Sequence, residues 1–278
     1  MWPYVIKDPI TIGTYGVMMA TGFMVGYYLL KAELLRRNIG SESDADWIIF
    51  VAMIAGVIGA KLAYLLTEAD HFSIRAFFSG AGLTWHGGLI LATLAIFGYI
   101  FAKKMPFWPT IDAITPELAT GYGIGRIGCQ LAGDGDYGLH CAANLHWPLC
   151  MSYPNGVVPT TDIVYATPMY ETIGSFILFG ILWAIRKRVK HPGVLFGIYL
   201  AGAGIMRFAV EFIRQTEGRP YRFWGLRDAQ LIALAELIVG LALWAYMAHR
   251  KVPETLEYGV RSIPGKPETH KKKHKNKH

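Results

Sequence analysis

The chain has 278 residues, of which 53% are hydrophobic and only 17% are charged, and its formal net charge is +7. A soluble domain is typically about 45–50% apolar and about 25% charged, so this composition argues against a soluble enzyme. Several apolar runs reach the roughly 20 residues that a transmembrane helix needs. The basic excess does not indicate a nucleic-acid partner, because no aromatic residues alternate with the basic residues of the C-terminal tail.

Seven apolar stretches predict seven transmembrane helices. In chain order they span residues 14–34, 47–67, 84–102, 112–132, 168–186, 193–213 and 228–248. The fourth stretch contains Asp112, Glu117 and Arg126, so we expect it to face protein or water rather than lipid. The sequence therefore predicts an all-α, polytopic membrane bundle over residues 1–250, with loops at 134–167 and 214–227 and a disordered basic tail at 251–278.

Lysine and arginine follow alternate stretches, which predicts the orientation of the bundle. They lie after the first, third, fifth and seventh stretches, at Arg36, Arg37, Lys103, Lys104, Arg186, Lys187, Arg188, Lys190, Arg250 and Lys251. Basic residues favour the cytoplasmic side, so we expect the N-terminus outside and the C-terminus inside. The loop after the sixth stretch breaks this rule with Arg214, Arg219, Arg222 and Arg227 on the outer side. Because guanidinium groups match phosphate oxygens, this loop favours an anionic ligand.

The fourth stretch carries GYGIGRIG at residues 121–128, which contains the pattern G-x-G-x-x-G. No strand precedes it, so it does not predict a dinucleotide site. Gly121 and Gly125 would instead allow close helix packing. Packing does not explain Arg126, since an arginine at membrane depth is costly unless it is paired or hydrated. Its partner could be a carboxylate, namely Asp134, Asp136 or Glu211, or a bound anion, which we favour.

The motif WHGGL places His86 at the outer end of the third stretch. A single histidine at a helix end is usually a hydrogen-bonded structural group, but it can also act as a general base near neutral pH. Gly87 and Gly88 would leave room for a large substrate beside it.

The segment RFAVEFIR places Arg207, Glu211 and Arg214 on one stripe of a helix. One interpretation is a buried network that fixes helix packing. The other is an anion clamp in which Glu211 orients the arginines, and we favour it because the stripe continues into the basic loop. Tyr170 and Glu171 of ATPMYE, like Tyr15, are expected at the membrane interface. They could contact substrate, or they could only anchor the helix ends at the interface. Histidines with metal-ligand spacing are absent, so we predict no metal site.

Taken in order, WHGGL, GRIG, TPMYE, RFAVEFIR and WGLRDAQ make the chain resemble the prolipoprotein diacylglyceryl transferases, enzymes of the bacterial inner membrane. The likeness runs over residues 15–230. It implies transfer of the diacylglyceryl group from phosphatidylglycerol to the lipobox cysteine of a prolipoprotein signal peptide, which forms a thioether and releases glycerol phosphate. It also implies a site facing the outer side of the bilayer and no cofactor.

Residue by residue, the resemblance assigns catalysis to His86, Arg126 and Arg207. It assigns substrate binding to Tyr15, Gly87, Gly88, Asp134, Tyr170, Glu171, Glu211 and Arg214. The chain departs from the family's motifs at Cys129, which replaces an asparagine, at Tyr165, which replaces a histidine, and at Lys61 and Ala203.

These departures leave two alternatives open. One is a transferase that uses the same lipid but another envelope acceptor. The other is a lipid-binding or transport protein without enzymatic activity, although no internal repeat typical of transporters is visible. Cys129, Cys141 and Cys150 are assigned structural roles, and an outer Cys141–Cys150 disulfide is compatible with this orientation.

Overall fold

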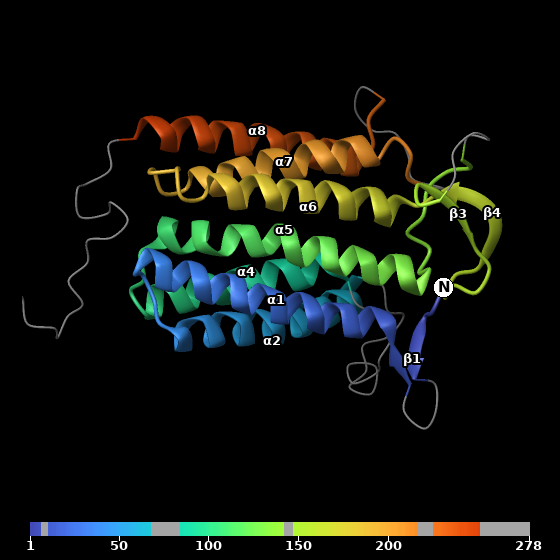
Figure 1. Ribbon diagram of the computed structural model, residues 1–278, viewed down its shortest axis with the longest axis horizontal. Coiled ribbons are helices and arrows are strands. Elements are labelled where there is room, and N and C mark those ends of the chain that lie inside the picture. Colours follow the sequence, from blue (N-terminus) through green and yellow to red (C-terminus); the bar gives the residue numbers. More distant parts are fainter. Residues whose placement is uncertain (7–10, 68–83, 142–146, 216–224, 251–278) are drawn as a thin grey trace, which may run out of the picture.

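The computed structural model describes residues 1–6, 11–67, 84–141, 147–215 and 225–250. Within these ranges seven helices run side by side along the long axis of the molecule (Figure 1). They are α1 (Thr14–Arg37), α2 (Glu42–Thr67), α4 (Trp85–Ala102), α5 (Phe107–Ala132), α6 (Thr167–Ile185), α7 (Val194–Val210) and α8 (Asp228–His249). Each of them coincides with one of the predicted apolar stretches.

The composition of these helices confirms a helical membrane bundle. Four of them, α2, α4, α6 and α8, are long and apolar enough to cross a membrane, and α7 is apolar but shorter. Large apolar side chains point away from the protein on these helices, for example Leu94 on α4 and Ile238 on α8, which are each 59% exposed. Such surfaces are stable in contact with lipid but not with water.

Helix α5 forms the centre of the bundle, as its polar residues predicted. Most of its side chains are buried, including Asp112 and Glu117. It packs against α1 on one side and against α6 and α7 on the other, while α2 pairs with α4 and α7 pairs with α8. Asp112 accepts hydrogen bonds from the backbone amides of Gly193 (2.9 Å) and Phe196 (3.1 Å), and so caps the N-terminus of α7.

Glycines bring α2 and α4 into backbone contact and correct one prediction. A Cβ added at Gly87 would lie 2.4 Å from the carbonyl oxygen of Gly59, and one added at Gly88 would lie 2.9 Å from that of Gly56. The space beside Gly87 and Gly88 is therefore occupied by α2. The expectation that this space is open to a large substrate is therefore wrong. The small size of the glycines instead allows the two helices to pack closely.

Two small antiparallel sheets lie together at one end of the bundle, which we call the sheet end (Figure 1). One pairs β1 (Tyr4–Ile6) with β2 (Ile12–Gly13), and the other pairs β3 (Cys150–Tyr153) with β4 (Thr160–Tyr165). The second sheet lies in the loop 134–167, which we had predicted to be irregular. The Cys141–Cys150 disulfide is present beside it. The predicted tail 251–278 lies outside the described residues. Arg219 and Arg222 of the predicted outer loop also lie outside them.

At the other end of the bundle, which we call the opposite end, the buried carboxylate of Glu33 holds a second group of arginines. Glu33 on α1 accepts hydrogen bonds from Arg36 (2.8 Å) and Arg37 (3.0 Å) of its own helix. It also accepts one from Arg186 (3.0 Å), which follows α6. This network joins α1 to the end of α6 without leaving the Glu33 charge unpaired.

Candidate active site

Arg126 projects from α5 near the sheet end and has several carboxylate partners. Its Nε lies 2.8 Å from Oε2 of Glu171, and its Nη1 forms an ion pair with Asp136. The hydroxyl of Tyr122, one helical turn earlier, accepts a hydrogen bond from Arg126 (3.2 Å) and donates one to Glu171 (2.8 Å). Arg126 is thus paired with carboxylates. Of the three partners considered from the sequence, Asp134, Asp136 and Glu211, it is Asp136 that forms the ion pair.

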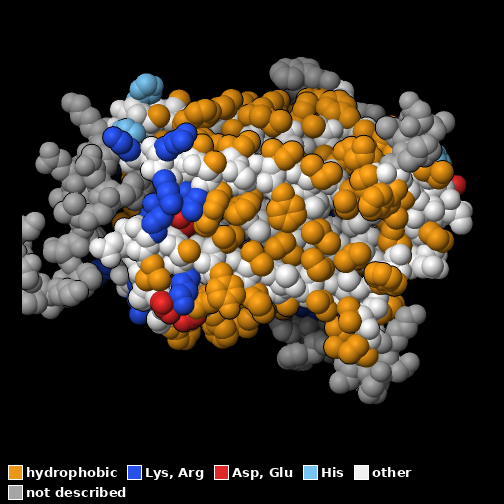
Figure 2. All heavy atoms as spheres, in the orientation of Figure 1, with side chains coloured by type: hydrophobic (Ala, Val, Ile, Leu, Met, Phe, Trp, Pro, Cys, Tyr) orange, Lys and Arg blue, Asp and Glu red, His pale blue; other side chains and the backbone are white. Residues whose placement is uncertain are grey.

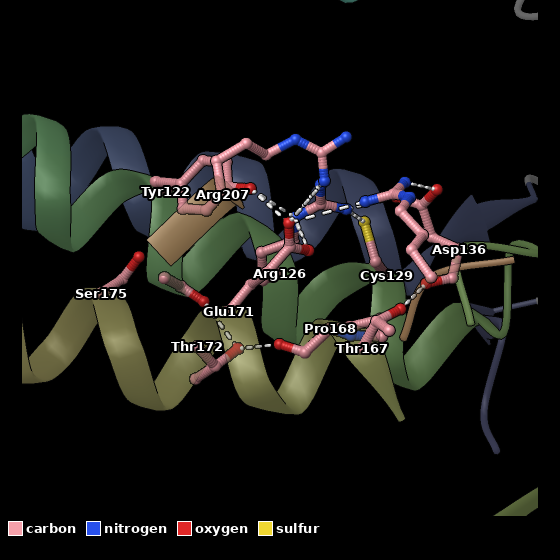
Figure 3. Close-up of polar contacts among 12 residues, drawn as sticks. Tyr122, Arg126, Cys129, Asp136, Thr167, Pro168, Glu171, Thr172, Ser175 and Arg207 are labelled. Carbon is pink, nitrogen blue, oxygen red and sulfur yellow. Dashed lines mark hydrogen bonds and ion pairs between the residues drawn. The ribbon is translucent and has the colours of Figure 1, made fainter. Parts of the chain in front are cut away.

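Glu171 lies at the centre of the site, in the first turns of α6, and is fully buried. Besides Arg126, its Oε1 lies 3.4 Å from Arg207 of α7 (Figure 3). The same oxygen lies 3.5 Å from Arg214. One carboxylate thus contacts three arginines that come from different parts of the chain.

Helix α7 ends earlier than predicted, and this changes the geometry of the RFAVEFIR segment. The helix stops at Val210, and Glu211 is its C-cap residue. Arg207 and Glu211 still form the expected ion pair, with 2.9 Å between Nη2 and Oε2. Arg214 lies beyond the end of the helix and turns to Asp136 and Glu171 instead. The prediction of one continuous helical stripe is therefore correct for Arg207 and Glu211 and wrong for Arg214.

Backbone pairing sets the positions of Asp136 and Arg214. Leu139, just after Asp136, donates its amide to the carbonyl of Ile213 (2.9 Å), so the chain after α5 lies against the chain after α7. Thr167, at the start of α6, donates its hydroxyl to the Asp136 carbonyl. These contacts bring the Asp136 carboxylate between Arg126 and Arg214, with which it forms ion pairs.

Asp134 and Asp136 are two residues apart, but their environments differ. Burial would raise the pKa of Asp136, but the guanidinium groups of Arg126 and Arg214 outweigh burial and hold it below its usual value. Burial raises the pKa of Asp134, and the nearby Asp136 carboxylate adds to this, against a hydrogen bond from the Cys129 thiol. Asp134, which the resemblance assigned to substrate binding, therefore faces Cys129, while Asp136 faces the arginines.

We call this constellation the arginine–carboxylate cluster. It comprises Arg126, Arg207 and Arg214 with Asp136, Glu171 and Glu211. Its three positive and three negative charges balance. The Arg207 side chain is the most accessible of the arginines at 26% exposed, compared with 14% for Arg126 and 15% for Arg214. An anion would therefore reach Arg207 first.

Cys129, Asp134 and Asp136 also place potential metal ligands within 4.8 Å of one another. Asp136 is already shared by two guanidinium groups, whose positive charges oppose a cation at the same place. The arrangement is better suited to an anion than to a metal ion.

The remaining predicted residues lie around this cluster at different distances. The ring of Tyr15 packs on Gly128 of α5, two residues after Arg126. Tyr170 contacts Tyr165, with 6.3 Å between ring centroids. His86 is exposed at the start of α4 and stacks edge-on with Trp85. Within the described part of the chain no hydrogen bond or ion pair connects His86 with the cluster.

Sequence reasoning missed two features of the site. Tyr122 was not singled out, although its place four residues before Arg126 put it on the same face of the helix. Glu171 was expected to contact substrate rather than to hold three arginines, because its partners are far away in the sequence. Arg227, just before α8, adds a hydrogen bond from its guanidinium to the carbonyl of Glu211 (3.2 Å).

The fold and the site together define a helical membrane protein with an arginine-rich polar centre at one end of its bundle. The family model described as prolipoprotein diacylglyceryl transferase matches residues 3–246, so the chain belongs to this family of transferases.

Curated relatives agree with this assignment. A phosphatidylglycerol–prolipoprotein diacylglyceryl transferase of Leptospira interrogans is 31% identical, with 82% of this chain and 86% of that protein covered. Proteins of the same name from Geobacillus kaustophilus (32% identical, 85% and 88% covered) and Prochlorococcus marinus strain NATL1A (30% identical, 88% and 91% covered) are similar along most of their length.

Proposed function

We propose that this protein transfers the diacylglyceryl group of phosphatidylglycerol to the thiol of a prolipoprotein cysteine. The observation that carries the proposal is the arginine–carboxylate cluster, found in a chain that matches the transferase family over residues 3–246. In this reaction the bond between sulfur and a glyceryl carbon forms, and the bond between that carbon and a phosphate oxygen breaks. The phosphate oxygen keeps the electron pair, and glycerol phosphate leaves.

Arg207 is proposed to stabilise the phosphate as it becomes the leaving group. It is the most exposed arginine of the cluster. Its Nη1 lies 3.4 Å from Glu171 and its Nη2 lies 2.9 Å from Glu211, which leaves others of its five N–H donors for a phosphate. Arg126 and Arg214 lie behind it on the same carboxylate and are proposed to strengthen the positive field. Such preorganised donors contribute most where water is excluded.

The attacking sulfur must lose its proton, because the thiolate rather than the thiol is the nucleophile. His86 is the proposed acceptor of this proton, and the departing phosphate is the alternative. A cysteine of the protein itself is a poor candidate for the nucleophile, since Cys129 is buried and Cys141 and Cys150 form the disulfide. Glu211 within the cluster, and Tyr15, Asp134 and Tyr170 around it, are proposed to shape the donor site.

The test is transfer of label from phosphatidylglycerol to a synthetic lipobox peptide by the purified protein. We expect Arg207→Ala to lower the rate by about 100-fold or more, as expected for the loss of a charge-stabilising donor. Arg207→Lys should recover part of the rate, because it keeps the charge but not the planar fork. Lys187→Gln at the opposite end serves as the matched control. Unchanged transfer in Arg207→Ala would contradict the role of the cluster.

The departure at Cys129 supports a second candidate, which is transfer from the same lipid to another envelope acceptor. The Sγ of Cys129 lies 3.7 Å from Nη1 of Arg126, so this departure from the family motif is located in the candidate site. Consumption of phosphatidylglycerol that depends on Arg207, without label on the lipobox peptide, would favour this candidate.

We also propose that the seven helices all span the bacterial inner membrane, with the N-terminus and the sheet end outside and the C-terminus inside. The Cys141–Cys150 disulfide supports this orientation, since disulfides persist in oxidising compartments. Basic side chains gather at the opposite end, as Figure 2 shows on one face. Labelling of single cysteines introduced at the two ends, with a reagent that does not cross the membrane, would test the orientation.

A further inference from the structure

A pocket of about 290 Å³ opens at the opposite end of the bundle, far from the arginine–carboxylate cluster. It lies between the connection of α6 to α7 and the last turn of α8. Its lining consists of Arg188, Val189, Lys190, His191, Val194 and Ala248. Among these residues two are cationic, one is an imidazole, three are apolar and none is a carboxylate.

The cations of this pocket differ from Arg37 and Arg186 nearby in having no carboxylate partner among the described residues. Arg186 is bonded to Glu33 at 3.0 Å, and Arg37 shares the same carboxylate. Asp112, the other buried carboxylate at this end, receives the amides of Gly193 and Phe196. In the part of the chain that the structure describes, neither Arg188 nor Lys190 forms an ion pair. Among the described residues, no carboxylate therefore compensates the positive charge at the pocket.

His191 supplies a second, independent observation. Its Nδ1 is buried and has no hydrogen-bond partner among the described residues. Buried polar atoms of this kind are nearly always bonded to protein, water or a ligand. A protonated imidazole donates from both of its nitrogens, and an oxyanion would accept from Nδ1.

We propose that this pocket binds the phosphate headgroup of an anionic glycerophospholipid from the bilayer leaflet at this end. Arg188, Lys190 and His191 would surround the phosphate, while Val189, Val194 and Ala248 would contact the glycerol backbone. The acyl chains would continue along the exposed apolar side chains of α6 and α8, such as Ile181 and Trp244. Basic residues at a membrane surface attract anionic lipid in this way.

A lipid bound here would also brace the turn between α6 and α7. Gly193 in this turn has a φ of +92° and is bonded through its amide to Asp112 of α5, the helix that also carries Arg126. The site lies outside the proposed transfer site and does not depend on the transfer reaction.

The test uses the full-length protein in nanodiscs with a photoactivatable phosphatidylglycerol that carries its diazirine near the glycerol backbone. We expect labelled peptides from residues 186–194 and 241–250. The double variant Arg188→Gln/Lys190→Gln should lower this labelling about tenfold, since each basic residue near the surface contributes to lipid attraction. Lys187→Gln, an exposed neighbour that does not line the pocket, should label like the wild type. Thermal unfolding of each variant in the same nanodiscs shows whether it is folded, and Lys190→Gln alone replaces the double variant if the double variant does not fold.

Three results would overturn the proposal. The first is equal labelling of these peptides by a phosphatidylcholine probe, which would indicate ordinary contact with surrounding lipid. The second is undiminished labelling in the folded double variant. The third is binding of inorganic phosphate that the double variant abolishes, in a protein whose 186–194 and 241–250 peptides take no lipid label. That result would assign the pocket to free phosphate.

Discussion

At the scale of single residues, the site rests on a carboxylate shared by several guanidinium groups. Three arginines held this close would repel one another in a water-poor interior, and Glu171 offsets this repulsion from the centre. The arrangement keeps the arginines charged and fixed before any lipid arrives. Preorganisation of this kind reduces the reorganisation that binding a phosphate would otherwise require.

The neighbours Asp134 and Asp136 should respond to substitution in opposite ways. Asp136→Asn breaks two ion pairs in a partly buried site, so we expect a loss of about 2–3 kcal/mol in stability at neutral pH. Asp134→Asn removes a carboxylate whose charged form is disfavoured by burial, so we expect unchanged or slightly higher stability. Thermal unfolding of the two purified variants in the same detergent measures the difference.

The pH dependence of the wild type follows from the same shift at Asp136. Its pKa in the folded protein is lower than in the unfolded chain, so its contribution to stability is present above the usual aspartate pKa, about 3.9, and is lost as the pH falls below it. The difference between wild type and Asp136→Asn should therefore shrink in acid. If Asp134→Asn proves the more destabilising of the two, the assignment of the pairing residue is contradicted.

At the scale of elements, long apolar runs sufficed to predict all seven helices, because a helix satisfies the backbone groups of such a run within the run itself. The end of α7 could not be read in the same way. The apolar pattern continues through Phe212, but the chain leaves the helix at Glu211 so that Ile213 can pair with Leu139. The pairing of Arg126 with Asp136 instead of Asp134 could not be predicted for the same reason. The end of α7 and this pairing both depend on contacts between segments far apart in the sequence, which local periodicity does not reveal.

The contact between α2 and α4 makes a prediction about glycine. Gly87→Ala places a Cβ 2.2 Å from that of Ala63, so the helices must separate, and we expect a loss of about 1–3 kcal/mol. Gly98→Ala on the same helix meets nothing within 4 Å and should be neutral or stabilising by up to about 1 kcal/mol. Thermal unfolding of both variants compares them directly, and equal melting temperatures would argue against a packing role for Gly87.

At the scale of the whole molecule, the two ends of the bundle use the same device for different purposes. Glu171 holds Arg126, Arg207 and Arg214 at the sheet end, and Glu33 holds three arginines at the opposite end. At the sheet end the Arg207 side chain is 26% exposed, and at the opposite end Arg36 is 29% exposed while Arg37 is fully buried. What separates the two clusters is what they connect: the cluster at the opposite end joins α1 with the end of α6, whereas the one at the sheet end belongs to the proposed transfer site.

Substitution of Glu33 alone should therefore lower the stability of the protein more than its transfer activity. Glu33→Gln leaves three arginines around a neutral amide in a site where the side chain is 1% exposed, so we expect a loss of about 3–5 kcal/mol. Glu42→Gln is the matched control. The ion pair of Glu42 with Lys31, at 2.7 Å, is about as short as that of Glu33 with Arg36, at 2.6 Å, but the Glu42 side chain is 61% exposed. An exposed pair of this kind contributes less than about 1 kcal/mol. Unfolding measurements on both variants, with transfer activity expressed per folded molecule, separate the two effects. If Glu33→Gln stays as stable as Glu42→Gln but loses transfer, the opposite end takes part in the reaction, and the division of roles between the two ends is wrong.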